Sequence, residues 1–128
     1  MALATTWERF PAEWPGLLAE VRAAVPADAR TALNVMLYRD DVPHVEVGLL
    51  TDAPAAPGGR VVASMLPGGT VATTTLRGGY DALPAAHQAV RAWCAAQGHR
   101  LAGPRWEVYG HWREDPARVE TEVAWLLA

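Results

Sequence analysis

The sequence contains no lysine and a single cysteine among its 128 residues. One cysteine, Cys94, can form neither a disulfide within the chain nor a cluster of cysteine metal ligands, and it fits a reducing compartment. All 11 basic residues are arginine, and 14 acidic residues outnumber them to give a formal net charge of −3. A mildly acidic domain lacks the positive surface that binds nucleic acid or anionic membranes. We therefore expect no direct nucleic-acid partner and no membrane partner.

Targeting segments and cofactor motifs are also missing. The N-terminal MALATTWERF has no basic region followed by an apolar run, as a signal peptide would, and no apolar stretch is long enough to span a bilayer. We therefore expect a cytoplasmic protein. The four histidines, His44, His87, His99 and His111, do not share the spacing of metal ligands, and no glycine-rich loop joins a strand to a helix. The sequence thus predicts no metal and no cofactor.

The first half of the chain has the pattern of a helix followed by a β-hairpin. Apolar residues recur at helical spacing over 13–25. Two runs rich in β-forming residues, 32–38 and 45–50, flank the polar turn RDDVPH. With 128 residues and 51% hydrophobic composition, the whole chain is expected to form one domain, residues 1–128.

The second half repeats this order after a loop rich in proline and glycine, TDAPAAPGG. The runs 60–66 and 70–76 flank PGG and predict a hairpin before the second helix. That helix is expected to end at Gly98, and its predicted buried face contains Leu83, His87, Val90, Trp93 and Cys94. The strands WEVYGHW and VETEVAWLL follow around REDPAR, with Trp125 expected in the core. Each half is therefore expected to contain a helix and a hairpin.

The two halves also resemble each other residue by residue. AEVRAAV matches QAVRAWC in the helices, and NVMLYRDDVPHVEVGLL resembles RWEVYGHWREDPARVETEVAWLL in the hairpins. This alignment pairs Tyr38 with Tyr109, Met36 with Glu107, and Glu46 with Glu122. The pattern predicts an internal duplication, with repeats at approximately 1–52 and 60–128.

The duplication leads to a specific fold class. Each half is expected to be a β-α-β-β module, and the first strand of the first module, within residues 1–10, is expected to be short or missing. Two such modules joined sheet edge to sheet edge give a curved antiparallel sheet in the α+β class. Both helices are expected on one face of this sheet, and the other face is left concave and open.

One carboxylate, Glu107, stands among large apolar residues in RWEVYGHW. Strand alternation puts Glu107 and Tyr109 on one face and Trp106 and Val108 on the other. If Trp106 and Val108 face the helices, Glu107 and Tyr109 lie on the open face, and Asn34, Met36 and Tyr38 lie there from the mirrored hairpin. A buried carboxylate among aromatic rings would bind a cation or a polarised electrophile. The more common role of such a residue is a carboxylate at a rim, bonded to a tyrosine or an arginine.

Four motifs follow one another in the second half of the chain. They are RGGY at 77–80, the helix end at Gly98, GPRWEVY at 103–109 and TEV at 121–123. This ordered set resembles the GyrI-like small-molecule-binding domain family over residues 10–128. The resemblance implies two β-α-β-β modules related by a pseudo-two-fold axis, with a ligand cleft at their junction on the open face of the sheet. It also implies Glu107 as the buried acid for cationic or electrophilic ligands. Members of the family include effector-binding domains of multidrug-responsive transcription regulators, gyrase-modulating proteins, and hydrolases of strained, cyclopropane-bearing genotoxins.

Three functions remain open from the sequence. The first is a stand-alone domain that binds an amphipathic, lipophilic or cationic small molecule. Its predicted ligand-binding residues are Glu107, Tyr109, Tyr38, Met36, Asn34 and Trp112. The second is a hydrolase of strained electrophiles, in which Glu107 is the general base and Tyr109 or Tyr38 bonds to the leaving group. The third is a protein-interaction role such as gyrase modulation, with a protein partner or a homodimer left open.

Overall fold

The computed structural model describes residues 1–26, 32–51, 57–111 and 114–128. In chain order, its main elements are β1 (Ala2–Ala4), α1 (Phe10–Ala24), β2 (Asn34–Tyr38), β3 (His44–Leu49), β4 (Val71–Arg77), α2 (Leu83–Gln97), β5 (Leu101–Tyr109) and β6 (Glu120–Leu127). Two short 3₁₀ turns, Tyr80–Ala82 and Pro116–Arg118, precede α2 and β6. Neither described helix has the length and apolar character needed to cross a membrane.

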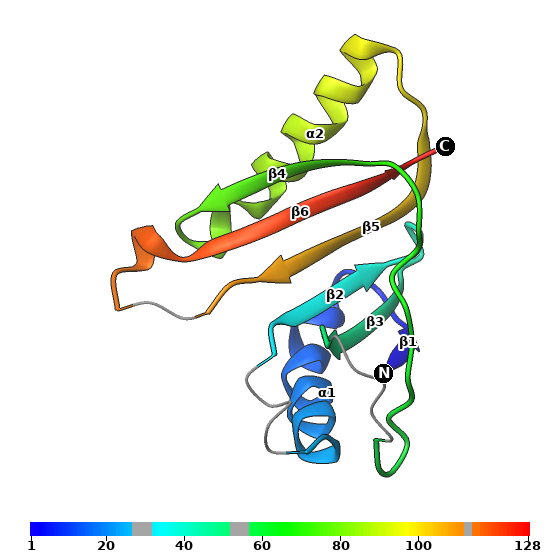
Figure 1. Cartoon of the computed structure of the whole chain (residues 1–128), viewed down its shortest axis with the longest axis vertical. Helices are drawn as coiled ribbons and strands as arrows, with labels where there is room; N and C mark the ends of the chain where they lie inside the picture. Colours follow the sequence, from blue (N-terminus) through cyan, green and yellow to red (C-terminus); the bar gives the residue numbers. More distant parts are fainter. Residues whose placement is uncertain (27–31, 52–56, 112–113) are drawn as a thin grey trace.

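The six strands form one antiparallel sheet in the order β1-β3-β2-β5-β6-β4 (Figure 1). Outward from the central β2 and β5, each half continues with its third strand and ends with its first. Met36 lies opposite Glu107 in the central pair, so a local two-fold axis passes between them. The α+β class, the paired modules and the short first strand are thereby confirmed. That the halves arose by duplication stays a prediction.

The strand registers support the predicted pairing of residues between the two halves. About the axis between Met36 and Glu107, the β2·β5 register relates Tyr38 to Tyr109. The β2·β3 and β5·β6 registers then relate Glu46 to Glu122.

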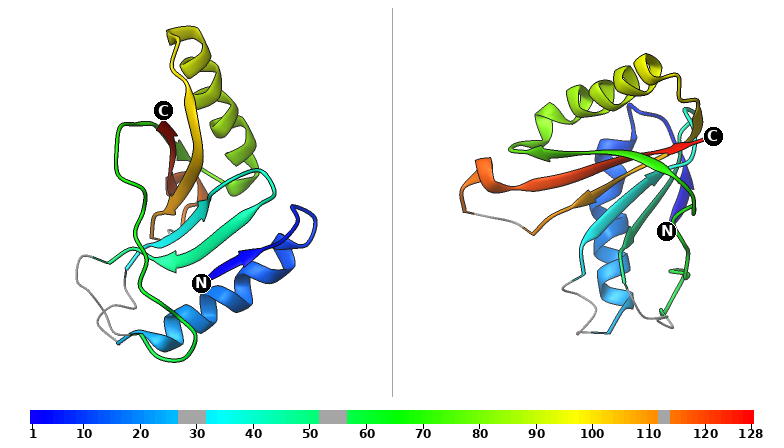
Figure 2. Two further views of the ribbon diagram at one scale, coloured as in Figure 1. Left: turned by 90° about the vertical axis from the view of Figure 1, so that its right-hand side faces the viewer. Right: turned by 45° about the horizontal axis from the view of Figure 1, so that its top comes forward.

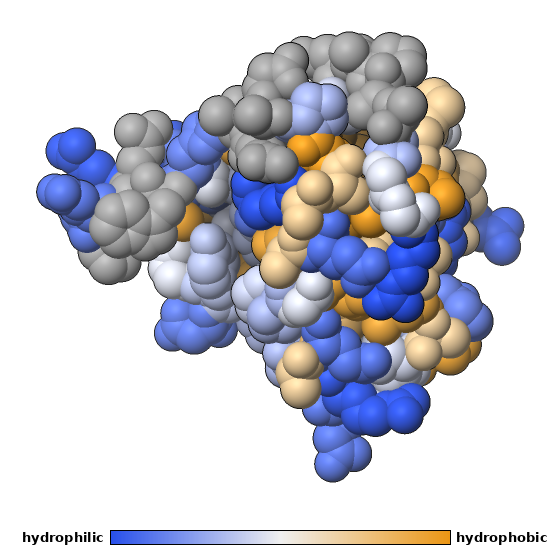
Figure 3. All heavy atoms as spheres, turned by 90° about the horizontal axis from the view of Figure 1, so that it is seen from below, coloured by the Kyte–Doolittle hydropathy of each residue, from blue (hydrophilic) through white to orange (hydrophobic). Residues whose placement is uncertain are grey.

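Both helices lie on the same face of the sheet, with the connection 57–70 on the opposite face (Figure 2). On the helix face, α1 packs over β2 and β3 in a core cluster that includes Phe10, Met36 and Val47. In the other half, α2 packs over β4 and β6 in a second cluster around Val90 and Val123. Each module therefore has its own helix-side core. On the surface seen from below, hydrophilic side chains separate the apolar patches (Figure 3).

The position of Trp106 corrects the predicted orientation of the sheet. Trp106 packs with Val35, Leu37 and Ala124 on the face away from the helices, so it does not face them as assumed. Glu107 and Tyr109 therefore lie on the helix-bearing face. The strand pattern could not show this, because β2 and β5 carry large side chains on both faces. The cleft, expected on the helix-free face, is on the opposite side from its predicted place.

The run 60–66 forms no strand, which corrects the predicted hairpin around PGG. It passes as an extended connection over the helix-free face, where Leu66 packs against the Trp106 cluster. The apolar pattern of this run therefore reflects contact with the sheet face and not strand pairing.

Two predictions about α2 have different outcomes. Gly98 ends the helix as predicted, because it takes a left-handed conformation at φ 75° that side chains disfavour. Trp93 was expected in the core, but its side chain is 50% exposed and stacks on His99. The sheet-facing stripe of α2 is narrow and is filled by Val90 and Cys94, whereas Trp125 is buried as expected.

One buried hydroxyl gives a stability prediction. Among the described residues, Thr121 Oγ1 is the buried side-chain polar atom without a hydrogen-bond partner. Thr121→Val should therefore raise the free energy of unfolding by about 1 kcal/mol in urea denaturation, because it removes an unsatisfied polar group at nearly constant volume. Thr5→Val is the matched control, since the buried Thr5 donates to Glu13. It should lower the stability by about the same amount, and equal losses in both variants would refute this account.

Candidate functional site

A cavity of about 460 Å³ lies on the helix-bearing face, where the two helix-side cores leave a gap. Its walls come from α1, the central strands and the start of α2, so both modules contribute. The principal side chains around it are Phe10, Trp14, Leu18 and Arg22 from α1; Asn34, Met36, Tyr38, Glu107 and Tyr109 from the strands; and Tyr80 and Leu83 near α2. The cavity is therefore mainly apolar and aromatic, with Glu107 as its acid.

The structure brings together five of the six predicted ligand-binding residues. Asn34, Met36, Tyr38, Glu107 and Tyr109 all line this one cavity. They do so because β2 and β5 pair directly and present alternate side chains to the same face. The sixth, Trp112, lies outside the described residues. Ligand contact by any of them stays a prediction.

Glu107 is 4% exposed and accepts hydrogen bonds from the two tyrosines. The hydroxyl of Tyr38 lies 3.0 Å from Glu107 Oε1, and that of Tyr109 lies 2.5 Å from the same atom. Both hydroxyls also lie near Met36 Sδ, at 3.8 and 3.5 Å, so they meet close to the two-fold axis. The two tyrosines thus form a symmetric pair about this axis. The carboxylate that accepts from both hydroxyls comes from one half of the molecule, since Met36 takes the place of Glu107 in the other half.

The other carboxylate oxygen is bonded to a histidine of α2. His87 Nε2 lies 2.7 Å from Glu107 Oε2, and the indole Nε1 of Trp125 lies 2.9 Å from His87 Nδ1. Three side chains from three elements therefore hold Glu107 in place. Since a carboxylate has about four acceptor positions, these bonds leave about one for a ligand or a water.

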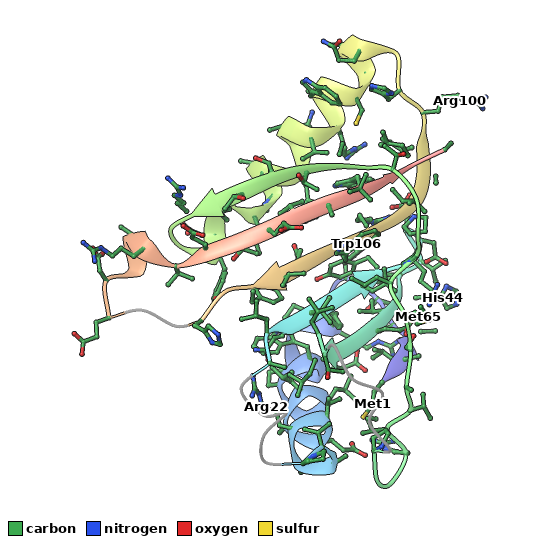
Figure 4. The ribbon with its side chains drawn as sticks, in the orientation of Figure 1. Met1, Arg22, His44, Met65, Arg100 and Trp106 are labelled. Carbon is green, nitrogen blue, oxygen red and sulfur yellow. The ribbon has the colours of Figure 1, made fainter. Side chains whose placement is uncertain are left out.

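Two arginines near the site are engaged elsewhere. Arg105 lies on the same face of β5 as Glu107, but its ion pair is with Asp41 at 2.8 Å, and it stacks between Trp7 and Trp125. Arg22 lies where α1 approaches the beginning of β2 (Figure 4), and it donates to Asn34. The bonded partners of Glu107 are thus the tyrosines and His87.

Burial raises the pKa of the Tyr38 and Tyr109 hydroxyls well above the ordinary tyrosine value, and the charge of Glu107 raises each pKa further. Both hydroxyls therefore remain protonated donors at neutral pH. In the unfolded chain they ionise near pH 10. The raised pKa values therefore contribute fully to the free energy of unfolding below about pH 10. This contribution is lost as the pH rises above about 10, because the unfolded state releases protons that the folded state retains.

The direction of this pH dependence can be tested. The chain has no lysine, so no lysine ammonium group titrates in the same pH range as the tyrosines. Above pH 10, the free energy of unfolding should fall by up to about 1.4 kcal/mol per pH unit for each of the two hydroxyls. The double variant Tyr38→Phe/Tyr109→Phe should flatten this fall in urea denaturation between pH 9.5 and 11. Tyr80→Phe, at a half-exposed tyrosine, is the control. An unchanged slope in the double variant would contradict the burial of these hydroxyls as donors.

Several residues of the site were not identified from the sequence. His87 was assigned to a buried helix face, and Trp125 to the core, with no polar role for either. The helix alignment, in which AEVRAAV matches QAVRAWC, pairs His87 with Leu18. A polar residue where the other half has leucine, together with Glu107 where it has Met36, was the available signal. Leu18, Met36 and Glu107 thus line the cavity, and His87 lies behind Glu107, bonded to its second oxygen.

Comparisons with known proteins agree with this architecture. The family model described as the GyrI-like small molecule binding domain matches residues 40–127. The chain belongs to the GyrI-like family. No curated protein sequence matches it at a significant level. The GyrI-like match begins after β2, so α1, Met36 and Tyr38 lie outside the matched segment.

Solved structures extend the likeness over the whole GyrI-like chain. A crystal structure of the EcmrR C-terminal domain matches with a TM-score of 0.72 at 20% identity, covering 99% of this chain and 87% of that one. A cryo-EM structure of an EcmrR–DNA complex matches with a TM-score of 0.71 at 20% identity, covering 97% of this chain. This chain spans 50% of the EcmrR chain in that complex. At this identity the likeness establishes the fold, including α1 and β2.

Proposed function

We propose that this GyrI-like domain binds an amphipathic organic cation in the cavity between α1 and the start of α2. The observation that carries the proposal is the buried Glu107, whose bonded partners are two neutral tyrosines and a histidine in an aromatic cavity of about 460 Å³. A buried anion held by neutral donors attracts a cation strongly, because little solvent screens it.

The ligand would lie with its charge towards Glu107 and its apolar body against α1. Phe10, Trp14 and Leu18 supply the apolar wall, and the faces of Tyr38 and Tyr109 add cation–π attraction at the charged end. The volume suits a ligand of two or three fused rings, within the range of small-molecule sites.

The test is a calorimetric titration with two isosteric probes, the cation 1-methylquinolinium and the neutral 1-methylnaphthalene. We expect the cation to bind at least about tenfold more tightly, since a charge-assisted contact contributes roughly 1.5–3 kcal/mol. Equal affinity for both probes would overturn the proposed recognition of charge, and the absence of any binding would overturn the site.

A hydrolase is the second candidate, and the placement of two tyrosine hydroxyls within 3.0 Å of Glu107 is the observation that favours it. In that reaction Glu107 takes a proton from water bonded at the remaining acceptor position of Oε2. The water oxygen then attacks a cyclopropane carbon, and the broken C–C bond leaves its electrons on an oxygen that a tyrosine protonates or bonds to.

A simple spirocyclopropane dienone, spiro[2.5]octa-4,7-dien-6-one, tests this reaction. Addition of one water would open its ring to 4-(2-hydroxyethyl)phenol. Formation of this product by the wild-type protein at a rate that Glu107→Gln reduces by about 10²-fold or more would establish the hydrolase. Recovery of the dienone at the uncatalysed rate would exclude it for this substrate class.

A further inference from the structure

We infer that His87 is a positioning residue: neutral, protonated at Nε2 and locked in that form by the indole of Trp125, it holds Glu107 ionised without adding a positive charge to the cavity. The His87 side chain is 19% exposed on α2, and it bridges Trp125 of β6 and Glu107 of β5. Its effect on ligand affinity rests on the proposed function, whereas its protonation state does not.

The proton positions follow from the donors. An indole N–H can only donate, so His87 Nδ1, 2.9 Å from Trp125 Nε1, must present its lone pair. A neutral imidazole with an unprotonated Nδ1 carries its proton on Nε2, and that proton points at Glu107 Oε2, 2.7 Å away. A protonated Glu107 donating to Nε2 would require the opposite tautomer, which would set an Nδ1–H against the indole N–H. The geometry therefore selects a neutral histidine whose Nε2–H donates to Glu107, and a hydrogen bond donated to a carboxyl group favours its ionised form.

The surroundings of Trp125 prevent the indole from turning away. The guanidinium carbon of Arg105 lies 5.0 Å from the Trp125 ring centroid, and that of Arg91 lies 5.7 Å from it. Trp125 is buried between β6 and α2, and the His87 ring meets it edge to face. The hydrogen bond that keeps His87 Nδ1 unprotonated thus comes from a tryptophan held in place by packing and by the guanidinium groups of Arg91 and Arg105.

Acidification should weaken the attraction between Glu107 and a bound cation by protonating His87. The charged and titratable groups facing His87 are Glu107 from β5, Arg105 behind the Trp125 ring, and Arg91 one turn along α2. Protonation of His87 would break the Trp125 bond and pair an imidazolium with Glu107. The charge that attracts a cation would then be cancelled, so the affinity for a cation falls as the pH falls.

The other half of the molecule shows what the site would be without this histidine. Leu18 occupies the position of His87 in the helix alignment, and Met36 occupies that of Glu107. Acid and histidine thus occur together in one half and are replaced together by apolar residues in the other. This joint replacement indicates that His87 acts through Glu107. It argues against an independent role of His87 in packing.

The direct test is the ¹⁵N resonance of each imidazole nitrogen in the free, uniformly ¹⁵N-labelled protein at pH 7.5, with the His87 signals identified by their loss in His87→Gln. We expect Nδ1 to show the shift of an unprotonated nitrogen and Nε2 that of a protonated one. In Trp125→Phe, Nδ1 loses its hydrogen-bond donor, so its shift should change, whereas Nε2, still bonded to Glu107, should keep the shift of a protonated nitrogen. An Nδ1–H tautomer or an imidazolium in the wild-type protein at pH 7.5 would overturn the inference.

The second readout is the affinity for 1-methylquinolinium between pH 5 and 8, measured in a His111→Gln background because His111 is a titratable residue that lines the cavity. With His87 intact, the affinity should fall by about tenfold or more on acidification. His87→Gln should bind with a flat pH profile, since its amide can donate to Glu107 but cannot ionise, and His87→Leu should bind weakly throughout. A pH profile of His87→Gln as steep as that of the protein with His87 intact would overturn the inference. Failure of the probe to bind at any pH would overturn the proposed function, and the ¹⁵N measurement would then decide the protonation state of His87.

Discussion

Trp106→Ala is expected to lower the free energy of unfolding by about 3–5 kcal/mol, the usual range for removing a large buried aromatic side chain. Trp106 is buried on the helix-free face of the central strand, where it contacts side chains from both modules. Val35 and Leu37 come from β2, and Ala124 comes from β6. The indole therefore joins the two halves of the sheet on the face that no helix covers, and its loss leaves a cavity that these strands cannot close.

The matched control is Trp93→Ala, which removes the same side chain from an exposed position on α2. Trp93 stacks on His99, so we expect a loss of about 1 kcal/mol or less. Urea denaturation followed by far-ultraviolet circular dichroism measures both variants without depending on tryptophan emission. Losses of equal size would show that the helix-free face contributes no more to stability than an exposed helix position.

Glu107→Gln is expected to reduce the affinity for 1-methylquinolinium by about 10- to 100-fold, corresponding to a charge-assisted contact of roughly 1.5–3 kcal/mol. Folding should change little, because the amide can satisfy the whole network. Its oxygen can accept from His87 Nε2, and its NH₂ group can donate to Tyr38 and Tyr109, whose hydroxyls are free to rotate.

Glu122→Gln controls for the change in overall charge. Glu122 lies on the adjacent strand β6 and is exposed, so this variant removes one negative charge without entering the cavity. Its affinity for the cation should stay within about twofold of wild type, since exposed charges are screened. If both variants weakened binding equally, the attraction would come from the net charge of the protein and not from Glu107.

The sequence predicted the site to the extent that strand pairing determines it. The resemblance between the hairpins paired Tyr38 with Tyr109 and Met36 with Glu107, and the strand registers relate the same pairs by the local two-fold axis. Pairing of this kind is predictable, because a slip of one residue would move every side chain to the wrong face.

The choice of face was not predictable in the same way. Val35, Leu37 and Trp106 are as apolar as the side chains around Glu107, so alternation alone gave two equivalent orientations. The role of His87 was hidden for a related reason. A histidine at helical spacing among apolar residues looks like part of a core face, and only the contact with Trp125 from a distant strand defines its proton.

The orientation of a bound cation tests the central claim most directly. In a crystal of the protein with 6-bromo-1-methylquinolinium, the anomalous signal of bromine locates one end of the ligand and the electron density locates the other. We predict the charged nitrogen within about 6 Å of the Tyr38 or Tyr109 ring and beside Glu107, with the bromine against Phe10 and Trp14 of α1. Bromine density beside Glu107, or a ligand bound outside the cavity, would contradict the account.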